Sequence, residues 1–180
     1  SKVNVATLSN TLTTVVRVSE PSCIHSIFKE LTNLFYCGLD IETTGLNSKK
    51  DKISLMQIYN HKTNICYVFD LILNRDENTS KSESIVYNTE LLSALSHHLK
   101  QTGDHFFVAA SAGFESAFIF NQLGVTLKIL CVQVLESFVV THKIATRDLS
   151  FLVNKYFDLT LSKELQTSNW HGQLSDDQYE

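Results

Sequence analysis

The sequence predicts an α/β fold in which helices flank a mixed β-sheet. In the first half, apolar and polar residues alternate at the two-residue period of strands. In the second half, short apolar strands are interleaved with segments whose apolar residues recur at helical spacing. A strand meander followed by alternating helices and strands is typical of a sheet that packs against helices.

One domain is the expected organisation, because 180 residues is an ordinary length for a single domain. With 43% hydrophobic residues, the chain can bury a full core and is not a disordered tail. The net charge of −4 argues against a basic clamp that binds long duplex nucleic acid tightly. It does not conflict with a carboxylate cluster whose charge is balanced by bound cations.

Cellular location is indicated only indirectly by the sequence. There is no apolar run of about 18 residues, so we expect no transmembrane helix and no membrane partner. The N-terminus also lacks the apolar core of a signal peptide. Cys23, Cys37, Cys66 and Cys131 form no Cys-x-x-Cys pair, which favours buried free thiols. These features suit an intracellular location, either the cytoplasm or a DNA-containing organelle.

Strands and one helix are expected in the first half. Residues 3–6 and 11–18 are rich in β-branched residues and predict strands. Pro21 suits the first turn of a helix, whose apolar stripe then reaches Leu31. Residues 34–41, 53–59 and 65–69 predict a three-strand meander, with a hairpin turn at 60–64 and the first strand at one side.

The second half begins after a polar loop at residues 74–84. Asn88 or Thr89 can cap a helix that runs to Leu99, and Gly124 ends a helix over residues 113–123. Strands are expected at 105–109 and 127–132, and further helices at 134–142 and 147–157. The tail from residue 158 to 180 is polar, with Trp170 as a packing anchor.

Two helices have faces that the apolar spacing assigns to the core. For residues 113–123 the predicted side consists of Phe114, Ala117, Phe118 and Asn121. For residues 147–157 it consists of Leu149, Leu152, Val153, Tyr156 and Phe157.

His97 and His98 are adjacent on the helix predicted to run to Leu99 and so point in different directions, which argues against a metal-binding pair.

Two carboxylates, Asp40 and Glu42, follow the apolar start of the strand at 34–41. Side chains two apart on a strand share one face, so both acids leave the strand on the same side. Like charges on an apolar strand are costly unless a cation joins them, and oxygen ligands suit Mg²⁺ or Mn²⁺. The alternative is a strand that ends in a solvated acidic turn at Gly45. The apolar lead-in and the Thr-Thr-Gly-Leu continuation favour the metal site.

Residues 47–52 form a polar loop directly after these acids. It contains Lys49, Lys50 and Lys52. Such a run is usually a solvated loop, but beside a metal site it can also contact a phosphate backbone.

Residues 40–46, Asp-Ile-Glu-Thr-Thr-Gly-Leu, resemble the first motif of the DEDD (DnaQ-like) 3′–5′ exonucleases. From about residue 34 to its end, the chain is similar to the proofreading domain of family A DNA polymerases and to ribonuclease D. The resemblance implies a ribonuclease H-like exonuclease fold and two divalent ions, Mg²⁺ or Mn²⁺. It also implies hydrolysis of 3′-terminal phosphodiesters of single-stranded DNA, with RNA as a possible substrate. A covalently linked polymerase domain is the implied protein partner.

The same resemblance implies roles for individual residues. Asp40 would bridge both metals, and Glu42 would bind the water-activating metal and the terminal 3′-hydroxyl. Thr43 would lie where the backbone meets the last nucleotide. Leu46 would wedge against the terminal bases, which is compatible with sequence-tolerant stacking on single strands.

The second motif departs from the family pattern. Family members have a sequence like His-Asn-x-x-Phe-Asp, whereas residues 110–115 here read Ala-Ser-Ala-Gly-Phe-Glu. Glu115 is then either the third metal ligand or an acid in a helix first turn, stabilised by the helix dipole. As a ligand it would reach about one methylene too far, and displacements near 1 Å matter in such sites. Gln133 stands where the family often has an Asp.

The tail carries the last resemblance. Residues 163–170 resemble a Lys-x-x-Gln-x-Ser-Asp-Trp segment, and residues 174–178 match a Leu-Ser-x-x-Gln helix start. In the family, a Tyr and the last metal-binding Asp come next, which would place them after Glu180. We therefore expect residues 1–180 to form one exonuclease domain cut before its last motif. Alone, it should degrade single-stranded DNA poorly, because carboxylates of such a site act as a unit.

Three readings of function follow. The first is a metal-dependent proofreading exonuclease that is part of a family A DNA polymerase, and the intact first motif favours it. The second is a degenerate, catalytically weak domain that binds nucleic acid or braces a polymerase, which Glu115, Ala110, Ser111 and Gln133 favour. The third is a ribonuclease similar to ribonuclease D, since both groups share these motifs.

Overall fold

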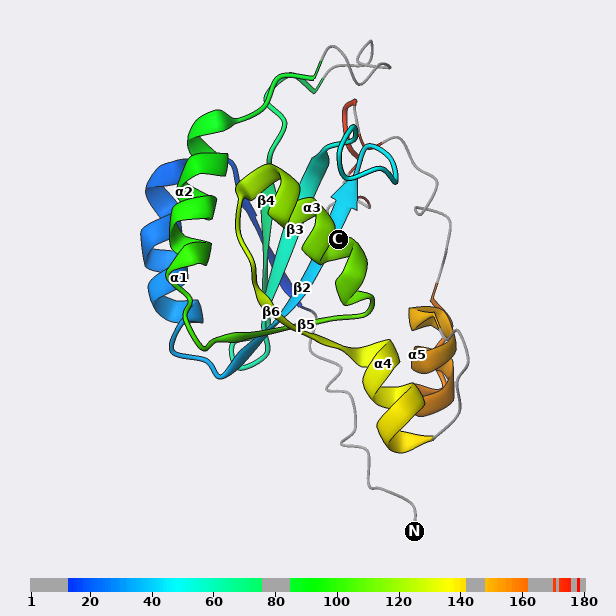
Figure 1. Cartoon of the computed structure of the whole chain (residues 1–180). Helices are drawn as coiled ribbons and strands as arrows, with labels where there is room; N and C mark the ends of the chain where they lie inside the picture. The colour runs from blue at the N-terminus through cyan, green and yellow to red at the C-terminus, as the bar shows by residue number, and fades with distance from the viewer. Residues whose placement is uncertain are drawn as a thin grey trace.

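The computed structural model describes residues 13–75, 85–141, 148–161, 170, 172–175 and 178. Its described strands form one six-stranded sheet with the order β1-β4-β3-β2-β5-β6 (Figure 1). The strands are β1 (Thr14–Val18), β2 (Tyr36–Thr43), β3 (Ile53–Asn60), β4 (Ile65–Asp70), β5 (Phe106–Ala109) and β6 (Lys128–Cys131). The strand predicted at residues 3–6 and most of the loop predicted at 74–84 lie outside the described residues.

The sheet is mixed, as the sequence predicts. The meander β2-β3-β4 is antiparallel, with β2 at one side of it. The pairs β1–β4, β2–β5 and β5–β6 are parallel, and along the chain a helix lies between the two strands of each pair, as parallel crossover connections require. As a result, β2 lies inside the sheet, between β3 and β5. Loops border its C-terminal end on both sides.

The helices begin and end close to the predicted positions. They are η1 (Pro21–Cys23), α1 (Ile24–Leu31), α2 (Thr89–Lys100), α3 (Ala112–Leu123), α4 (Val132–Leu135), the π-helical η3 (Glu136–Val140) and α5 (Leu149–Phe157). Asn88 caps α2, since its side chain accepts a hydrogen bond from the Leu91 N–H at 3.1 Å. Gly124 ends α3 in the left-handed conformation, with φ of 63°.

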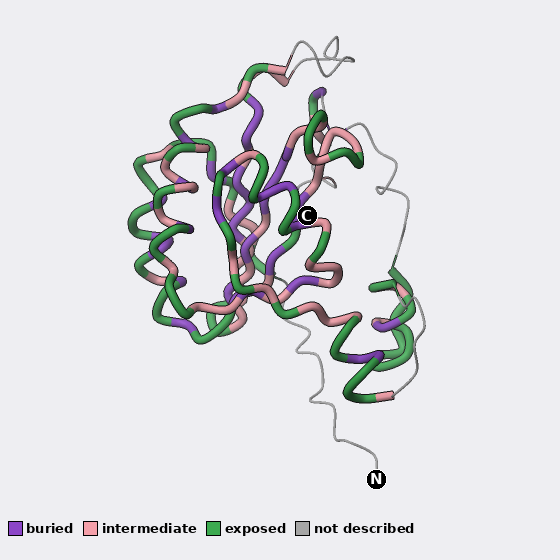
Figure 2. Tube along the Cα trace, in the orientation of Figure 1, coloured by how far each residue is buried: buried purple, intermediate pink, exposed green. Residues whose placement is uncertain are grey.

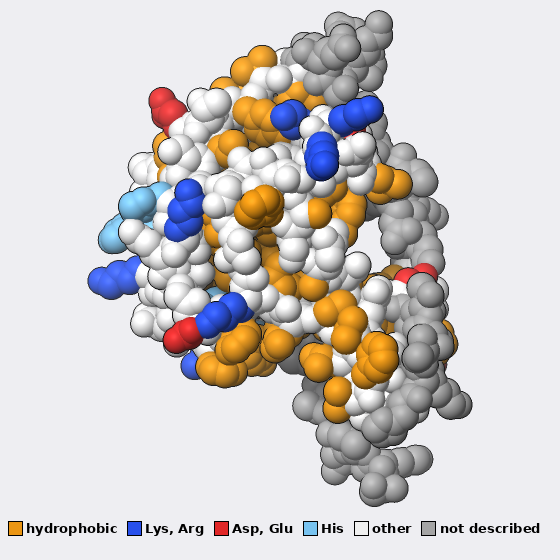
Figure 3. Space-filling model, in the orientation of Figure 1, with side chains coloured by type: hydrophobic (Ala, Val, Ile, Leu, Met, Phe, Trp, Pro, Cys, Tyr) orange, Lys and Arg blue, Asp and Glu red, His pale blue; other side chains and the backbone are white. Residues whose placement is uncertain are grey.

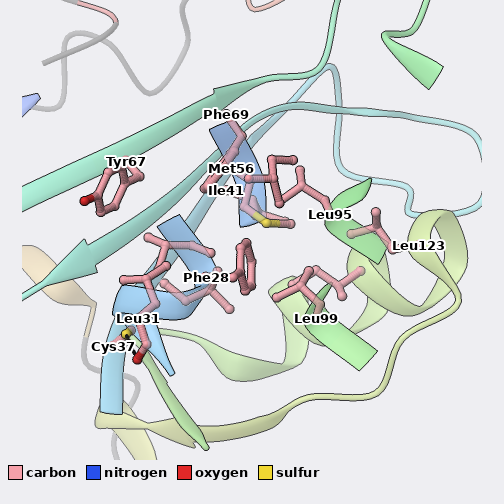
Figure 4. Packing of buried hydrophobic residues seen from close by; sticks show 14 of the residues in the cluster. Phe28, Leu31, Cys37, Ile41, Met56, Tyr67, Phe69, Leu95, Leu99 and Leu123 are labelled. Carbon is pink, nitrogen blue, oxygen red and sulfur yellow. Dashed lines mark hydrogen bonds between the residues drawn. The ribbon is translucent and has the colours of Figure 1, made fainter. Parts of the chain in front are cut away.

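The main core lies between one face of the sheet and helices α1, α2 and α3 (Figures 2 and 4). Phe28 and Leu31 from α1, with Leu95 and Leu99 from α2, pack against strand residues such as Phe69. Because these contacts hold the strands from one side, the alternate residues of β2 are free to face the other side.

The opposite face carries a smaller cluster. Leu55 of β3 and Val68 of β4 pack there against Trp170 from the tail. Trp170 is 6% exposed, which confirms it as a packing anchor. Trp170 therefore lies on the same face of the sheet that carries Asp40 and Glu42.

The face predicted for α5 is wrong in most positions. Leu152 is buried, but Leu149, Tyr156 and Phe157 are exposed and Val153 is half-buried. The reason is that α5 packs beside α4 and η3, away from the sheet (Figure 1). This contact is narrow and buries one row of α5 side chains, which includes Leu152. The other apolar side chains of α4, η3 and α5 form a surface patch (Figure 3).

The face predicted for α3 is also only partly right. Phe118 is buried and Phe114 half-buried, whereas Ala117 and Asn121 are exposed. The buried row instead consists of Glu115, Phe118, Ile119 and Leu123. Sequence patterning assigns an acid to the outer face of a helix. Because Glu115 is buried instead, the buried face of α3 is rotated from the predicted face by about one residue, or about 100°.

The cysteines only partly fit the predicted buried free thiols. All four are free, yet Cys23 is exposed, and Cys66 and Cys131 are half-buried. Cys37 is fully buried in the core, where burial raises the pKa of its thiol to about 12. Among the described residues, no helix is long and apolar enough to cross a membrane.

Candidate functional site

The end of β2 presents two acids on the less covered face of the sheet. Leu39 and Ile41 are buried in the main core, whereas Asp40 is open to solvent and Glu42 is half-buried. In the antiparallel pairing, Asp40 lies opposite Gln57 of β3. The register then shifts between Glu42 and Thr43, and such bulges re-aim side chains at the ends of strands. The predicted same-side arrangement of the two carboxylates is confirmed.

A tight loop holds the residues that follow these acids. The Thr43 hydroxyl donates to the Gly45 carbonyl oxygen at 2.6 Å. A Cβ on Gly45 would lie 2.5 Å from the carboxyl group of Asp51, so a larger residue would displace this carboxyl from the hydrogen bond of 2.7 Å that it accepts from the Asn47 N–H. Thr44 and Lys52 close the loop with a backbone hydrogen bond of 2.9 Å. The loop thus fixes the positions of Thr43 and Leu46 relative to the acids.

Helix α3 is tied to the sheet at the far end of this loop. The Gln122 side chain donates to the Asp51 carbonyl oxygen and accepts from the Ile53 N–H, each at 2.9 Å. The Tyr87 hydroxyl lies 3.2 Å from the same Gln122 oxygen. These bonds hold α3 against the start of β3, so that the first turn of the helix, with Glu115, lies near the acidic strand.

A hollow of about 640 Å³ opens at the end of β2. Four of the five residues that the sequence singles out line it: Asp40, Glu42, Thr43 and Leu46. Ile41, Thr44 and Gly45 of the same stretch also line it, and its other walls come from distant parts of the chain: Ala110, Phe114, Gln133, Asp148, Leu149 and Trp170. Leu46 is 88% exposed at the rim, as a side chain that contacts a ligand from above would be.

Glu115 lies beneath this surface and does not line the hollow. It is only 4% exposed, and its Oε2 atom has no hydrogen-bond partner. Burial raises the pKa of Glu115 to about 7; its own backbone N–H lowers it, and the Asp40 charge raises it further. A helix-capping acid usually remains in water, so a buried, unpaired carboxyl oxygen favours the ligand reading over the capping one.

The acids of β2 are electrostatically perturbed as well. Burial raises the pKa of Glu42 to about 7, and the neighbouring Asp40 adds to the rise. The pKa of Asp40 is also raised, because the protein around its carboxylate displaces part of the hydrating water, although a hydrogen bond from the Ile41 backbone lowers it. Clustered carboxylates that resist ionisation are the arrangement that a bound cation would stabilise.

The three acids have the oxygen atoms that a divalent cation prefers, but their side chains do not converge on a single point. Asp40, Glu42 and Glu115 offer only oxygen atoms, which Mg²⁺ and Mn²⁺ prefer. In the part of the chain that the structure describes, no three His, Cys, Asp or Glu side chains are arranged to hold a metal ion. Asp40 and Glu42 line the hollow and would hold the ion there, and the unpaired Oε2 of Glu115 is a candidate third ligand.

Two wall residues were not expected from the sequence. Asp148 caps α5 by accepting a hydrogen bond from the Phe151 N–H at 2.8 Å, and it also faces the hollow. An acid before an apolar helix is a recognisable capping signal, but nothing in it indicates a position near residue 40. Trp170 reaches the hollow from the tail, where the sequence predicts only an anchor.

Comparison with known proteins gives a consistent result. A family model described as 3′–5′ exonuclease matches residues 15–179. A search of curated protein sequences finds no match. Among solved structures, the EXO domain of Aedes aegypti Nibbler is similar with a TM-score of 0.68 and 16% identity, over 97% of this chain and 83% of that one.

Two bacterial structures extend the comparison. Escherichia coli RNase D, described as an exoribonuclease involved in structured RNA processing, matches with a TM-score of 0.69 and 14% identity. That match covers 91% of this chain but 39% of RNase D. Brucella melitensis NrnC with bound Mg²⁺ matches with a TM-score of 0.64 and 17% identity, over 92% of this chain and 70% of NrnC. At these identities the likeness establishes the fold.

Proposed function

The chain belongs to the 3′–5′ exonuclease family, and from this membership we propose that it removes nucleotides from the 3′ end of single-stranded nucleic acid. Its ribonuclease H-like exonuclease fold, expected from the sequence, is the fold of the matched structures. The observation that carries the proposal is the carboxylate group of the hollow. Burial and then the Asp40 charge raise the pKa of both Glu42 and Glu115, so Asp40 lies within electrostatic reach of each of these acids.

The residues of the hollow have distinct proposed tasks. Asp40 and Glu42 would hold divalent ions, and Glu115 would add a third carboxylate. When bound, two such ions activate a water molecule and stabilise the leaving oxygen of a phosphodiester. Thr43 fixes the loop beside the last nucleotide through its bond to Gly45. Leu46, exposed at the rim, contacts the terminal base by apolar packing.

Single-stranded DNA is the substrate that we propose first. The support is the resemblance of residues 163–170 to the tail of polymerase proofreading domains. On this reading, the domain proofreads as part of a family A DNA polymerase and works beside a covalently linked polymerase domain. RNA is the competing substrate, because the matched structures include RNase D.

A second candidate function is binding without efficient hydrolysis. Ala110 and Gln133 line the hollow with neutral side chains. The family resemblance leads us to expect polar or acidic residues at both positions. A domain of this kind would hold a 3′ end, or brace an attached domain, while ions bind weakly.

Single-turnover hydrolysis tests the proposal. The protein, in excess and with Mn²⁺ or Mg²⁺, is mixed with a 5′-labelled single strand of DNA or of RNA with the same sequence. We expect slow stepwise shortening from the 3′ end, and no shortening with Asp40→Ala or EDTA. A circular single strand serves as a control, since it has no 3′ end. Cleavage of the circle, or equal activity of Asp40→Ala, would contradict the proposal. Binding without hydrolysis would leave the second candidate.

A further inference from the structure

One arginine that has no assigned task lies almost buried next to the sheet. The Arg75 side chain is 9% exposed, in the segment that follows β4. Its Nε donates to both carboxylate oxygens of Asp70, at 2.9 and 3.1 Å, and its Nη2 approaches Asp70 Oδ1 at 2.8 Å. Because a buried charge is costly without a partner, this pair fixes the guanidinium group in place.

The other donors of Arg75 join two more segments. Nη1 donates to the carbonyl oxygens of Trp170 at 3.0 Å and Gly172 at 3.3 Å. Nη2 donates to Ser54, at 2.7 Å to its hydroxyl and 3.2 Å to its carbonyl oxygen. The Ser54 hydroxyl in turn donates to the Trp170 carbonyl oxygen at 2.7 Å. We call this set of bonds, by which Asp70, Arg75 and Ser54 hold Trp170 and Gly172, the arginine clasp.

The clasp matters for the hollow because of what it holds. Trp170 packs on Leu55 and Val68, in a cluster separate from the main core. The same residue forms part of the wall of the hollow that Asp40 and Glu42 line. Among the described residues, the buried part of this cluster is Leu55, Val68 and Trp170, and directional bonds to the Trp170 carbonyl oxygen add to these apolar contacts in fixing where Trp170 lies.

We propose that Arg75 is a positioning residue for the candidate site. Through the clasp it fixes Trp170 as a wall of the hollow, and so sets the space that the 3′-terminal nucleotide enters. Only a planar group with several fixed donors can bond an acid, a hydroxyl and three carbonyl oxygens at once, which is why lysine cannot replace it. The effect on substrate rests on the proposed function; the position of Trp170 does not.

Binding and clasp closure are then coupled. A nucleotide that occupies the hollow touches the wall at Trp170, so it binds the clasped form more tightly than a form with the tail displaced. By linkage, the ligand favours the clasped form to the same extent that the clasp favours the ligand. Loss of Arg75 should therefore weaken substrate binding more than it slows the chemical step.

The chain provides its own reporter, since Trp170 is its one tryptophan. In Arg75→Met we expect the tryptophan emission to shift to the red and acrylamide quenching to increase, because the indole becomes wetter. Arg75→Lys should restore little of this. Tyr67→Phe is the matched control: it removes a hydrogen bond of 3.0 Å to Glu30 in the main core, on the other face of the sheet. Its emission should equal that of the unmodified protein.

The second readout is affinity for a short single-stranded oligonucleotide with Mn²⁺, by anisotropy, and the KM for hydrolysis. With Arg75→Met we expect the Kd for the oligonucleotide and the KM each to rise about tenfold, with a smaller change in kcat, as when the support of a site is loosened. Tyr67→Phe should change neither. If Arg75→Met folds poorly, Ser54→Ala removes a single donor to Trp170 and should shift emission and affinity in the same direction by a smaller factor.

Three results decide the matter. An unchanged emission in folded Arg75→Met would overturn the clasp itself. A shifted emission with unchanged affinity and KM would overturn its role in positioning the site. If the unmodified protein binds no oligonucleotide, the proposed function fails, while the emission of the variants still decides whether the clasp holds Trp170.

Discussion

Replacing Glu115 with Gln should stabilise the metal-free protein at alkaline pH and leave it unchanged in acid. Burial raises the pKa of Glu115 from 4.5 to about 7 in the folded state. A group whose folded-state pKa is raised favours folding while it is protonated. Its contribution is therefore complete below about pH 4.5 and is lost as the pH rises through about 7. Glutamine cannot ionise, so Glu115→Gln escapes this loss.

The size of the effect follows from the same values. A rise from 4.5 to about 7 corresponds to at most about 3 kcal/mol of unfolding free energy at pH well above 7. Water in the adjoining hollow lowers the cost of the charge, so we expect a gain of about 1–3 kcal/mol for Glu115→Gln at pH 8. Glu42 has a raised pKa in both proteins, so its contribution cancels in the difference.

Urea unfolding followed by circular dichroism, in EDTA at pH 5 and pH 8, measures this difference. Glu20→Gln is the control, because Glu20 is exposed and its replacement should change stability by less than about 0.5 kcal/mol at either pH. Mn²⁺ at pH 8 should then stabilise the unmodified protein more than Glu115→Gln, since an ion bound to the folded state adds stability by mass action. If Glu115→Gln is equally destabilising at both pH values, Glu115 is a structural acid and the reasoning is wrong.

Three further predictions concern Glu115 as a ligand, the lysines of the loop after β2, and the cap of α2. Glu115→Asp should raise the single-turnover rate and Glu115→Ala should abolish it, because the shorter acid restores the family geometry; unchanged rates in both would remove Glu115 from the site. Lys49 and Lys50 are exposed in the loop after β2, where basic side chains gather (Figure 3). Changing both to Ala should weaken oligonucleotide binding and reduce the slope of log affinity against log salt by about 0.7 per lysine. An unchanged slope would show that these lysines do not contact the phosphate backbone. Asn88→Ala should cost about 1–2 kcal/mol of unfolding free energy, because the Asn88 side chain accepts from the Leu91 N–H and donates to the Ser19 carbonyl oxygen at 2.8 Å. A loss below about 0.5 kcal/mol in urea unfolding would show that the cap is dispensable.

Local patterns in the sequence determined a large part of the fold. The meander was predictable because β2, β3 and β4 alternate apolar and polar residues, and the same alternation placed Asp40 and Glu42 on one face. Caps such as Asn88 and Gly124 were predictable because each satisfies a local hydrogen-bonding or backbone requirement. These features depend on neighbours within a few positions along the chain.

The rest depends on contacts between distant residues. The exposed face of α5 could not be predicted, since apolar spacing does not show which elements lie beside it; among the described residues these are α4 and η3. The burial of Glu115 follows from its place under Asp40, and periodicity assigns acids to the surface. Arg75 and Trp170 are joined across 95 positions, and no local signal near either residue indicates the other.

Calorimetric titration with Mn²⁺ at pH 8 tests most directly the central claim that the acids at the end of β2 hold catalytic cations. At this pH the raised pKa of about 7 still leaves Glu42 mostly ionised and able to bind. We predict saturable binding to the unmodified protein and its loss in Asp40→Ala, with identical circular dichroism spectra, since Asp40 lies open to the hollow and outside the core. Equal binding of Mn²⁺ by both proteins would contradict the account.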